Sequence, residues 1–158
     1  MTDKVPMTLV GYDQLNEELK KLKFEERPAI VAAIEEARSH GDLSENAEYQ
    51  TARDKQSFIE GRIQDLEAAL SRAQVIDPKT LSGDTVLFGA TVDVLDTDTE
   101  NKQTYQIVGQ YEANLEKGLI SHISPLAKAL IGKNAGDIVE VQTPKGEKAY
   151  EILAIRFI

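Results

Sequence analysis

Two carboxylates in a short polar segment are the residues of this chain best suited to chemistry. Asp42 and Glu45 lie three residues apart in segment 40–49 (HGDLSENAEY). Carboxylate oxygens are hard ligands, and Mg²⁺ in proteins commonly takes one or two of them, with water and phosphate oxygens in its other positions. Two carboxylates alone hold this ion weakly. We therefore expect the pair to act beside another metal-bearing site, or, alternatively, to form a capping box at the start of a helix.

Two arginines and a tyrosine accompany this acidic pair. Arg38 and Arg53 lie on either side of it along the chain. If the two arms around the segment are helices, both arginines come within reach of one side of the structure, where they could contact a phosphate. The alternative is a pair of solvated surface arginines. Tyr49 fits a packed position between the helices better than a base-stacking platform.

Other kinds of catalytic site are missing from the sequence. The chain contains no cysteine, no nucleophile-and-base motif and no glycine-rich phosphate loop. Its two histidines, His40 and His122, lie in different halves, where either could have a purely structural role. We expect no self-contained active site and no cofactor bound stably by the chain alone.

The charge and composition restrict the possible partners. The 158 residues include 18 basic and 27 acidic ones, for a net charge of -9. A protein that neutralises nucleic-acid phosphates over a broad face carries the opposite sign. No stretch approaches the ~20 apolar residues of a membrane span, and residues 1–10 lack the layout of a secretory signal. These features predict a cytoplasmic protein without a membrane partner.

The first half of the chain has the spacing of a helical hairpin. Two apolar stripes alternate steps of three and four residues, as in a coiled coil: Leu15, Leu19, Leu22, Ile30, Ala33 or Ile34, and Ala37; then Tyr49, Ala52, Gln56, Ile59, Ile63, Leu66, Leu70 and Ala73. Gly41 is placed to end the first helix, and Asp42 or Ser44 to cap the second. The short connection predicts antiparallel arms roughly 40 Å long. The step of eight from Leu22 to Ile30 predicts an irregularity near Pro28.

The second half alternates apolar and polar residues in period two. We expect strands at 85–95, 102–108, 119–123, 137–142 and 148–157, with a short helix at 125–131. The sequence thus predicts an α+β fold in two domains. They are a helical hairpin over 1–76 and an antiparallel sheet domain over 84–158, joined by a linker over 77–83.

Several separated motifs stand in a fixed order along the chain: 41–49 (GDLSENAEY), 60–63 (EGRI), 73–77 (AQVID) and 124–133 (SPLAKALIGK). Together they resemble the motifs of the bacterial Gre transcript-cleavage factors, and the acidic balance is similar to the GreA type. The resemblance implies a coiled-coil hairpin followed by an FKBP-like domain. It also implies a partner, bacterial RNA polymerase, whose secondary channel the hairpin enters to stimulate cleavage of backtracked nascent RNA.

The same resemblance implies roles for individual residues. Asp42 and Glu45 would act in trans at the polymerase active centre and help to hold a second Mg²⁺ shared with the polymerase. The other implied roles are RNA contact near the 3′ end for Arg38 and Arg53, support of the hairpin tip for Ser44, Asn46 and Tyr49, and polymerase docking for Ser124, Pro125 and Ala127. The factor would be a monomer and would not be an enzyme by itself.

Three alternatives remain open from the sequence. A channel-binding inhibitor could use the same scaffold without promoting hydrolysis. A peptidyl-prolyl isomerase would need an aromatic pocket, for which the second half offers Phe88, Tyr105, Tyr111, Tyr150 and Phe157, and no tryptophan. A purely structural coiled-coil adaptor is the third alternative.

Overall fold

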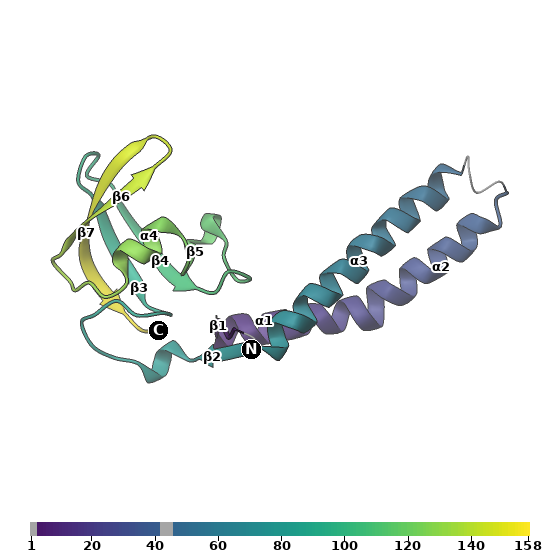
Figure 1. The fold of residues 1–158 in the computed structure, drawn as a ribbon, viewed down its shortest axis with the longest axis horizontal. Helices are drawn as coiled ribbons and strands as arrows, with labels where there is room; N and C mark the ends of the chain where they lie inside the picture. The colour runs from purple at the N-terminus through teal and green to yellow at the C-terminus, as the bar shows by residue number, and fades with distance from the viewer. Residues whose placement is uncertain (1–2, 42–45) are drawn as a thin grey trace. The chain divides into compact units, whose positions relative to one another are not determined.

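The computed structural model describes residues 3–41 and 46–158. Its contacts divide the chain into two compact units. The hairpin unit is centred on Tyr12–Ala73, and the sheet unit consists of Lys4–Gly11 together with Gln74–Ile158. Figure 1 shows long helices in the first and a curled sheet with a short helix in the second. The predicted α+β fold, a helical hairpin followed by a sheet domain, is confirmed.

The hairpin consists of two antiparallel helical arms. The first arm runs through α1 (Leu9–Lys21), a π-helical turn η1 (Leu22–Glu26) and α2 (Arg27–Arg38), and the second is α3 (Ala47–Ser71). Figure 1 shows α2 and α3 side by side. The 25 residues of α3 correspond to about 38 Å at 1.5 Å per residue.

The buried faces of the two arms follow the predicted spacing. The buried side chains are Leu15, Leu22, Ile30 and Ala37 on the first arm, and Ala52, Ile59, Ile63, Leu66 and Ala69 on the second. Near the end of α3 the contact has moved by one position, because Ala69 is buried and Leu70 only half-buried. A straight helix drifts by about 20° per heptad, so a strict seven-residue pattern misplaces the contact over this length.

The irregularity predicted near Pro28 is a π-helical turn. The backbone N–H of Arg27 bonds to the carbonyl of Leu22, five residues back. The turn therefore absorbs one extra residue, and Leu22 and Ile30, eight positions apart, both remain buried. Pro28 lies in the first turn of α2 and has no N–H to donate to the carbonyl four residues before it, which favours this break in the α-helical pattern.

Ion pairs fix the register of the two arms. Arg27 forms two hydrogen bonds with Glu60, both of 2.8 Å, and Arg62 forms two with Glu18, of 2.7 and 3.0 Å. Exposed ion pairs add little stability individually, but these two-point contacts are geometrically specific.

The sheet unit contains five strands in the order β5-β4-β3-β7-β6. The strands are β3 (Thr91–Asp96), β4 (Lys102–Val108), β5 (Leu119–Ser121), β6 (Ile138–Thr143) and β7 (Gly146–Arg156). Three pairings are antiparallel, as predicted, whereas β4 and β5 pair in parallel. The connection between these two strands, residues 109–118, contains the 3₁₀ turn η3 (Leu115–Lys117).

The core of the sheet unit lies between the sheet and the helix α4 (Pro125–Leu130). Its buried members include Val92, Val94, Ile107, Leu130 and Ile152. The strand expected from residue 85 begins only at Thr91. A turn precedes it, in which the N–H of Ala90 bonds to the carbonyl of Leu87 and Gly89 has a φ of +90°.

A two-stranded sheet that the sequence pattern did not predict is formed by β1 (Val5–Thr8) and β2 (Ala73–Ile76). The 3₁₀ turn η2 (Pro78–Thr80) follows β2. Each strand has only four residues, so a period-two pattern has little room to appear. Among the described residues, no helix has the length and apolar character required to cross a membrane.

Glu112 joins the start of α1 to the rest of the sheet unit. Its carboxylate accepts hydrogen bonds from the N–H of Thr8 at 3.0 Å, from the Thr8 hydroxyl, and from the N–H of Gly109 at 2.8 Å. The Thr8 hydroxyl oxygen in turn accepts from the N–H of Gly11 at 3.1 Å, which caps α1. A Cβ on Gly11 would overlap the Glu112 carboxylate, and one on Gly109 would overlap the carbonyl oxygen of Pro6.

Candidate functional site

The segment with the two candidate metal ligands connects the two arms of the hairpin. The helix α2 ends at Arg38 with Ser39 as its C-cap, and α3 begins at Ala47. Asp42, Ser44 and Glu45 lie outside the described residues, so their predicted roles remain predictions. The structure describes the residues on both sides of this segment.

Asn46 is the N-cap of α3. Its Oδ1 accepts a hydrogen bond from the N–H of Tyr49 at 3.1 Å. Its Nδ2 donates to the carbonyl oxygen of Ala37, the penultimate residue of α2, at 2.6 Å. The N-cap of α3 is therefore Asn46 and not the predicted Asp42 or Ser44, because the helix begins at Ala47. The predicted capping box of Asp42 and Glu45 lies outside the described residues.

Tyr49 and Arg53 contact each other on successive turns of α3. The guanidinium carbon of Arg53 lies 5.9 Å from the centre of the Tyr49 ring, and Nη1 donates to the phenol oxygen at 3.3 Å. This spacing fits a cation–π contact. Tyr49 is half-buried, as expected of a residue at the edge of the helix interface, and Arg53 is exposed.

Arg38 is also exposed. Its Nη1 lies 3.7 Å from the carboxylate of Glu35 on the same helix. The two arginines thus have different neighbours: Arg53 is held on a ring, and Arg38 makes a loose ion pair with a carboxylate one turn away. Both present charge to the solvent close to the end of the hairpin. Their contact with RNA stays a prediction.

His40 and Glu48 face each other across the end of the hairpin, with Nδ1 and Oε2 3.5 Å apart. A structural role is one of the predictions for His40, whereas the sequence pattern does not single out Glu48. The sequence signal that could have identified Glu48 is its position in the first turn of α3, where an acidic side chain interacts favourably with the helix dipole. The C-cap is Ser39, and the backbone N–H of His40 bonds to the carbonyl of Ala37 at 3.2 Å.

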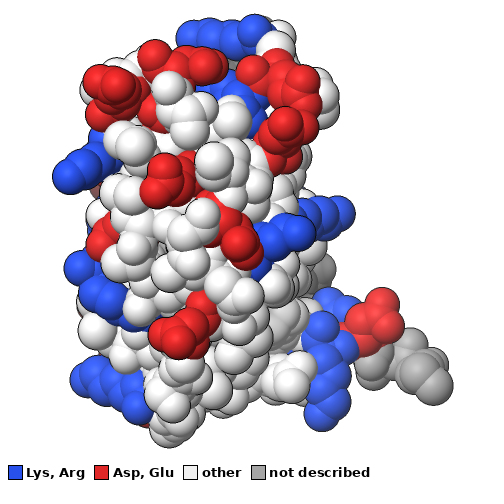
Figure 2. Space-filling model, turned by 90° about the vertical axis from the view of Figure 1, so that its left-hand side faces the viewer, with Lys and Arg blue, Asp and Glu red and all other residues white. Residues whose placement is uncertain are grey.

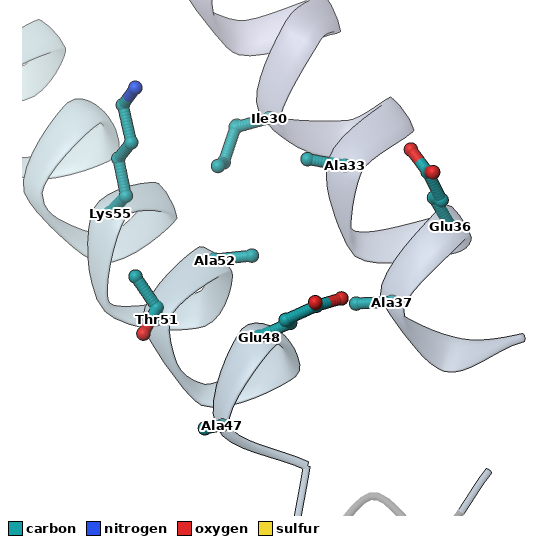
Figure 3. A pocket seen from close by; sticks show the side chains of 9 residues that line it. All are labelled: Ile30, Ala33, Glu36, Ala37, Ala47, Glu48, Thr51, Ala52 and Lys55. Atoms are coloured by element: carbon teal, nitrogen blue, oxygen red, sulfur yellow. The ribbon is translucent and has the colours of Figure 1, made fainter. Parts of the chain in front are cut away.

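A shallow groove of about 560 Å³ lies between α2 and α3 near this end. Three of the residues that line it, Ala33, Ala37 and Ala52, have small side chains, which leaves space between the helices (Figure 3). Glu48 lines it towards the connecting segment, Glu36 lines it on the α2 side, and Lys55 lines it on the side away from that segment (Figure 3).

The three residues predicted to dock on a partner lie at the start of α4. Ser124 is the N-cap, with Oγ accepting from the N–H of Ala127 at 3.3 Å, and Pro125 lies in the first turn. Pro125 is exposed, but Ala127 is completely buried in the core. The side chain of Ala127 therefore packs inside the sheet unit, and the surface of this helix is formed by neighbours such as Pro125 and Lys128.

The aromatic residues that an isomerase pocket would use are mostly committed to packing. Tyr150 belongs to the buried core, and Phe88, Tyr105 and Phe157 pack against it. Burial is also the main reason why the pKa of Tyr105 is raised. This arrangement gives no support to the isomerase alternative.

Charges of both signs are interspersed with uncharged side chains on the face of the molecule shown in Figure 2. Such a mixed face lacks the single positive sign that favours binding to phosphates. Within residues 3–41 and 46–158, no group of three or more histidines or carboxylates is arranged to hold a metal ion.

Comparisons with known proteins agree with the two-unit architecture. The family model described as "Transcription elongation factor, N-terminal" matches residues 5–75, and the one described as "Transcription elongation factor, GreA/GreB, C-term" matches residues 81–157. These matches define the class of the protein as a transcription elongation factor, as the sequence motifs indicate.

Individual relatives match nearly the whole chain. Transcription elongation factor GreA of Paracoccus denitrificans (strain Pd 1222) is 61% identical over 156 residues, which cover 99% of both chains. Its counterpart from Acidiphilium cryptum (strain JF-5) is 62% identical over 154 residues, 98% of both. The crystal structure of GreA factor homolog 1 of Thermus thermophilus is 30% identical, with 97% of this chain and 99% of that chain covered and a TM-score of 0.45. The chain belongs to the GreA/GreB family of transcription elongation factors.

Proposed function

We propose that this elongation factor binds RNA polymerase and stimulates the polymerase to cleave backtracked RNA near its 3′ end. The observation that carries the proposal is the position of segment 42–45, which joins two antiparallel helices at one end of the hairpin. An arm of about 38 Å is long enough to carry two carboxylates into a narrow channel. The sheet unit would provide the docking surface, with Ser124 and Pro125 at the start of α4.

The carboxylates of Asp42 and Glu45 would serve as ligands of a Mg²⁺ ion shared with the polymerase. Their chemistry suits this ion, because Mg²⁺ accepts one or two carboxylates and keeps several positions for water and phosphate oxygens. The ion, when bound, would activate a water molecule and stabilise charge on the oxygens of the scissile phosphodiester. Alone, the pair is too weak a site, which supports a factor that completes the polymerase site rather than an independent enzyme.

The neighbouring residues would hold the RNA and the tip of the hairpin. Arg53, oriented by Tyr49, and Arg38 would offer positive charge to the phosphates of the displaced RNA. Asn46, as the cap of α3, would support the tip. We also propose that the factor acts as a monomer in the cytoplasm.

The test uses a polymerase elongation complex that is stalled after backtracking and carries end-labelled RNA. The full chain should accelerate the release of short 3′ fragments, and Asp42→Ala or Glu45→Ala should reduce that rate by at least about tenfold with polymerase binding retained. Glu25→Ala, which removes an exposed carboxylate from η1, is the matched control and should behave like the unmodified chain.

The same experiment separates the alternatives. Cleavage that is slower with the chain than without it would identify a channel-binding inhibitor. Polymerase binding without any effect on the RNA would favour a structural adaptor. Full stimulation by the Asp42→Ala/Glu45→Ala double variant would contradict the role of the two carboxylates.

A further inference from the structure

Asn46 makes two side-chain hydrogen bonds that serve different elements. The amide oxygen accepts from the N–H of Tyr49 at 3.1 Å and so begins α3, whereas the amide nitrogen donates to the carbonyl of Ala37 at 2.6 Å, across to the end of α2. The Ala37 carbonyl also accepts the N–H of His40 at 3.2 Å. One side chain therefore ties the last turn of one arm to the first turn of the other.

A helix cap by itself does not need an asparagine. Serine, threonine and aspartate also supply the oxygen that accepts the N–H of the first turn. Of these residues, only asparagine adds an amide N–H₂ group that can donate. The donated bond to Ala37 links residues nine positions apart in the chain, and Asp42 and Glu45 lie between them. Capping therefore accounts for the hydrogen bond from Tyr49 but not for the hydrogen bond that Asn46 donates to Ala37.

We propose that Asn46 is a positioning residue for Asp42 and Glu45, acting through its amide hydrogen bond to Ala37. This inference rests on the function proposed above. A segment whose two ends are held close together has fewer conformations than one with free ends. Groups that orient metal ligands from outside the coordination shell change metal affinity or activity by about 10- to 100-fold when they are lost.

Three substitutions separate the two hydrogen bonds. Asn46→Asp keeps an oxygen for Tyr49 but replaces the donor to Ala37 with a second acceptor. Asn46→Ser keeps a neutral cap and adds no charge, but it replaces the amide with a shorter hydroxyl, so the Nδ2 donor that reaches Ala37 is lost. Asn46→Ala loses both bonds. A role confined to capping would leave the first two variants like the unmodified chain, because aspartate and serine are good caps.

The first measurement is stimulated cleavage as a function of Mg²⁺ concentration, with polymerase binding measured in parallel. We expect Asn46→Asp and Asn46→Ser to need about tenfold more Mg²⁺ for half-maximal cleavage, with unchanged helix content and unchanged polymerase affinity. An unaltered Mg²⁺ dependence in both variants would overturn the proposal. Loss of helix content in both would overturn it as well, since the effect would then come from the cap.

The second measurement does not depend on cleavage. Because the chain has no cysteine, nitroxide labels can be attached at Ser39→Cys and Ala47→Cys, two exposed positions on either side of the segment. The distance distribution between the labels should be narrow in the chain that retains Asn46 and broader in the Asn46→Asp and Asn46→Ser variants. Equal widths would refute the link to Ala37.

The two measurements also distinguish failure of this inference from failure of the proposed function. If Asp42→Ala and Glu45→Ala abolish cleavage but the Asn46 variants do not alter it, the inference alone is wrong. If the unmodified chain does not stimulate cleavage, the proposed function is wrong, and the distance distributions still decide whether Asn46 fixes the ends of the segment.

Discussion

Arg27 and Glu60 form a two-point ion pair across the hairpin, with Nε and Nη2 of the arginine each 2.8 Å from a carboxylate oxygen. Arg27 is the first residue after the π-helical turn. The pair therefore marks the point at which the first arm returns to register with the second. The hydrogen bonds from Arg27 lower the pKa of Glu60 from its usual value of 4.5.

Glu60→Gln should weaken the hairpin only when Glu60 is ionised. A carboxyl whose pKa is lowered on folding contributes stability above its unfolded pKa, and this contribution is lost as the pH falls through the folded pKa. The unfolding midpoint of the unmodified chain should therefore exceed that of Glu60→Gln at neutral pH, and the two should converge below about pH 4.5. Thermal unfolding followed by circular dichroism at a series of pH values checks this, and a pH-independent difference would contradict it.

Glu147 is expected to show the opposite pH dependence. Its pKa is raised, mainly by a side-chain hydrogen bond to the neighbouring carboxyl of Glu140. A raised pKa contributes stability at low pH that is lost as the pH rises through the folded pKa. Glu147→Gln should thus raise the unfolding midpoint at pH 7 and have little effect in acid. Glu140→Gln is the control and should give the same gain, while the double substitution should add little further.

A side chain at position 11 should destabilise the fold. Gly11→Ala places a Cβ into the Glu112 carboxylate, and we expect a loss of about 1–3 kcal/mol in the free energy of unfolding, the usual cost of overpacking. Gly61→Ala is the matched control, because a Cβ there meets no atom within 4 Å. Urea unfolding of both variants measures the difference, and equal stabilities would show that Glu112 can move aside.

The π-helical turn should be removable by deleting one residue if Pro28 is also replaced. Deleting Glu25 alone should cost roughly 3 kcal/mol, because it places Pro28 inside a regular helix. Combining the deletion with Pro28→Ala should recover most of this loss, since Leu22 and Ile30 are then one heptad apart. Deletion of Ala32 is the control, since it should turn Ala37 out of the interface. Thermal unfolding compares the three, and a stable Ala32 deletion would contradict the register.

Much of the fold was predictable because long amphipathic helices carry a strong periodic signal. The spacing of Ile59, Ile63 and Leu66 predicted their burial, and the step from Leu22 to Ile30 predicted the break between α1 and α2. The parallel pairing of β5 was not predictable, because so short a strand carries no information about its direction. The β1-β2 pair was missed for the same reason of length.

At the candidate site, the chemistry of the carboxylates and arginines stays a prediction, whereas the local geometry differs from the predicted one. The residue types indicated the carboxylates and arginines, and the Gre resemblance implied the supporting asparagine, but the start of the second helix was predicted too early. Asp42, Ser44 and Asn46 lie close together in the chain, and all three residue types are good N-caps. Residue preference alone therefore could not identify which of them caps the helix. The hydrogen bond to Ala37 depends on the pairing of the two arms, which no local pattern reveals.

The hydrogen bonds that Glu112 accepts from Thr8 and Gly109 affect how the sheet unit can be produced as a separate fragment. A fragment excised at residue 77 would begin after β2 and would lack Thr8, so two of the donors to the Glu112 carboxylate would be lost. The fragment would also lack Pro6, whose carbonyl oxygen packs closely against Gly109. A self-sufficient truncation of the carboxy-terminal half therefore has to retain the start of the chain up to Gly11, for example by circular permutation.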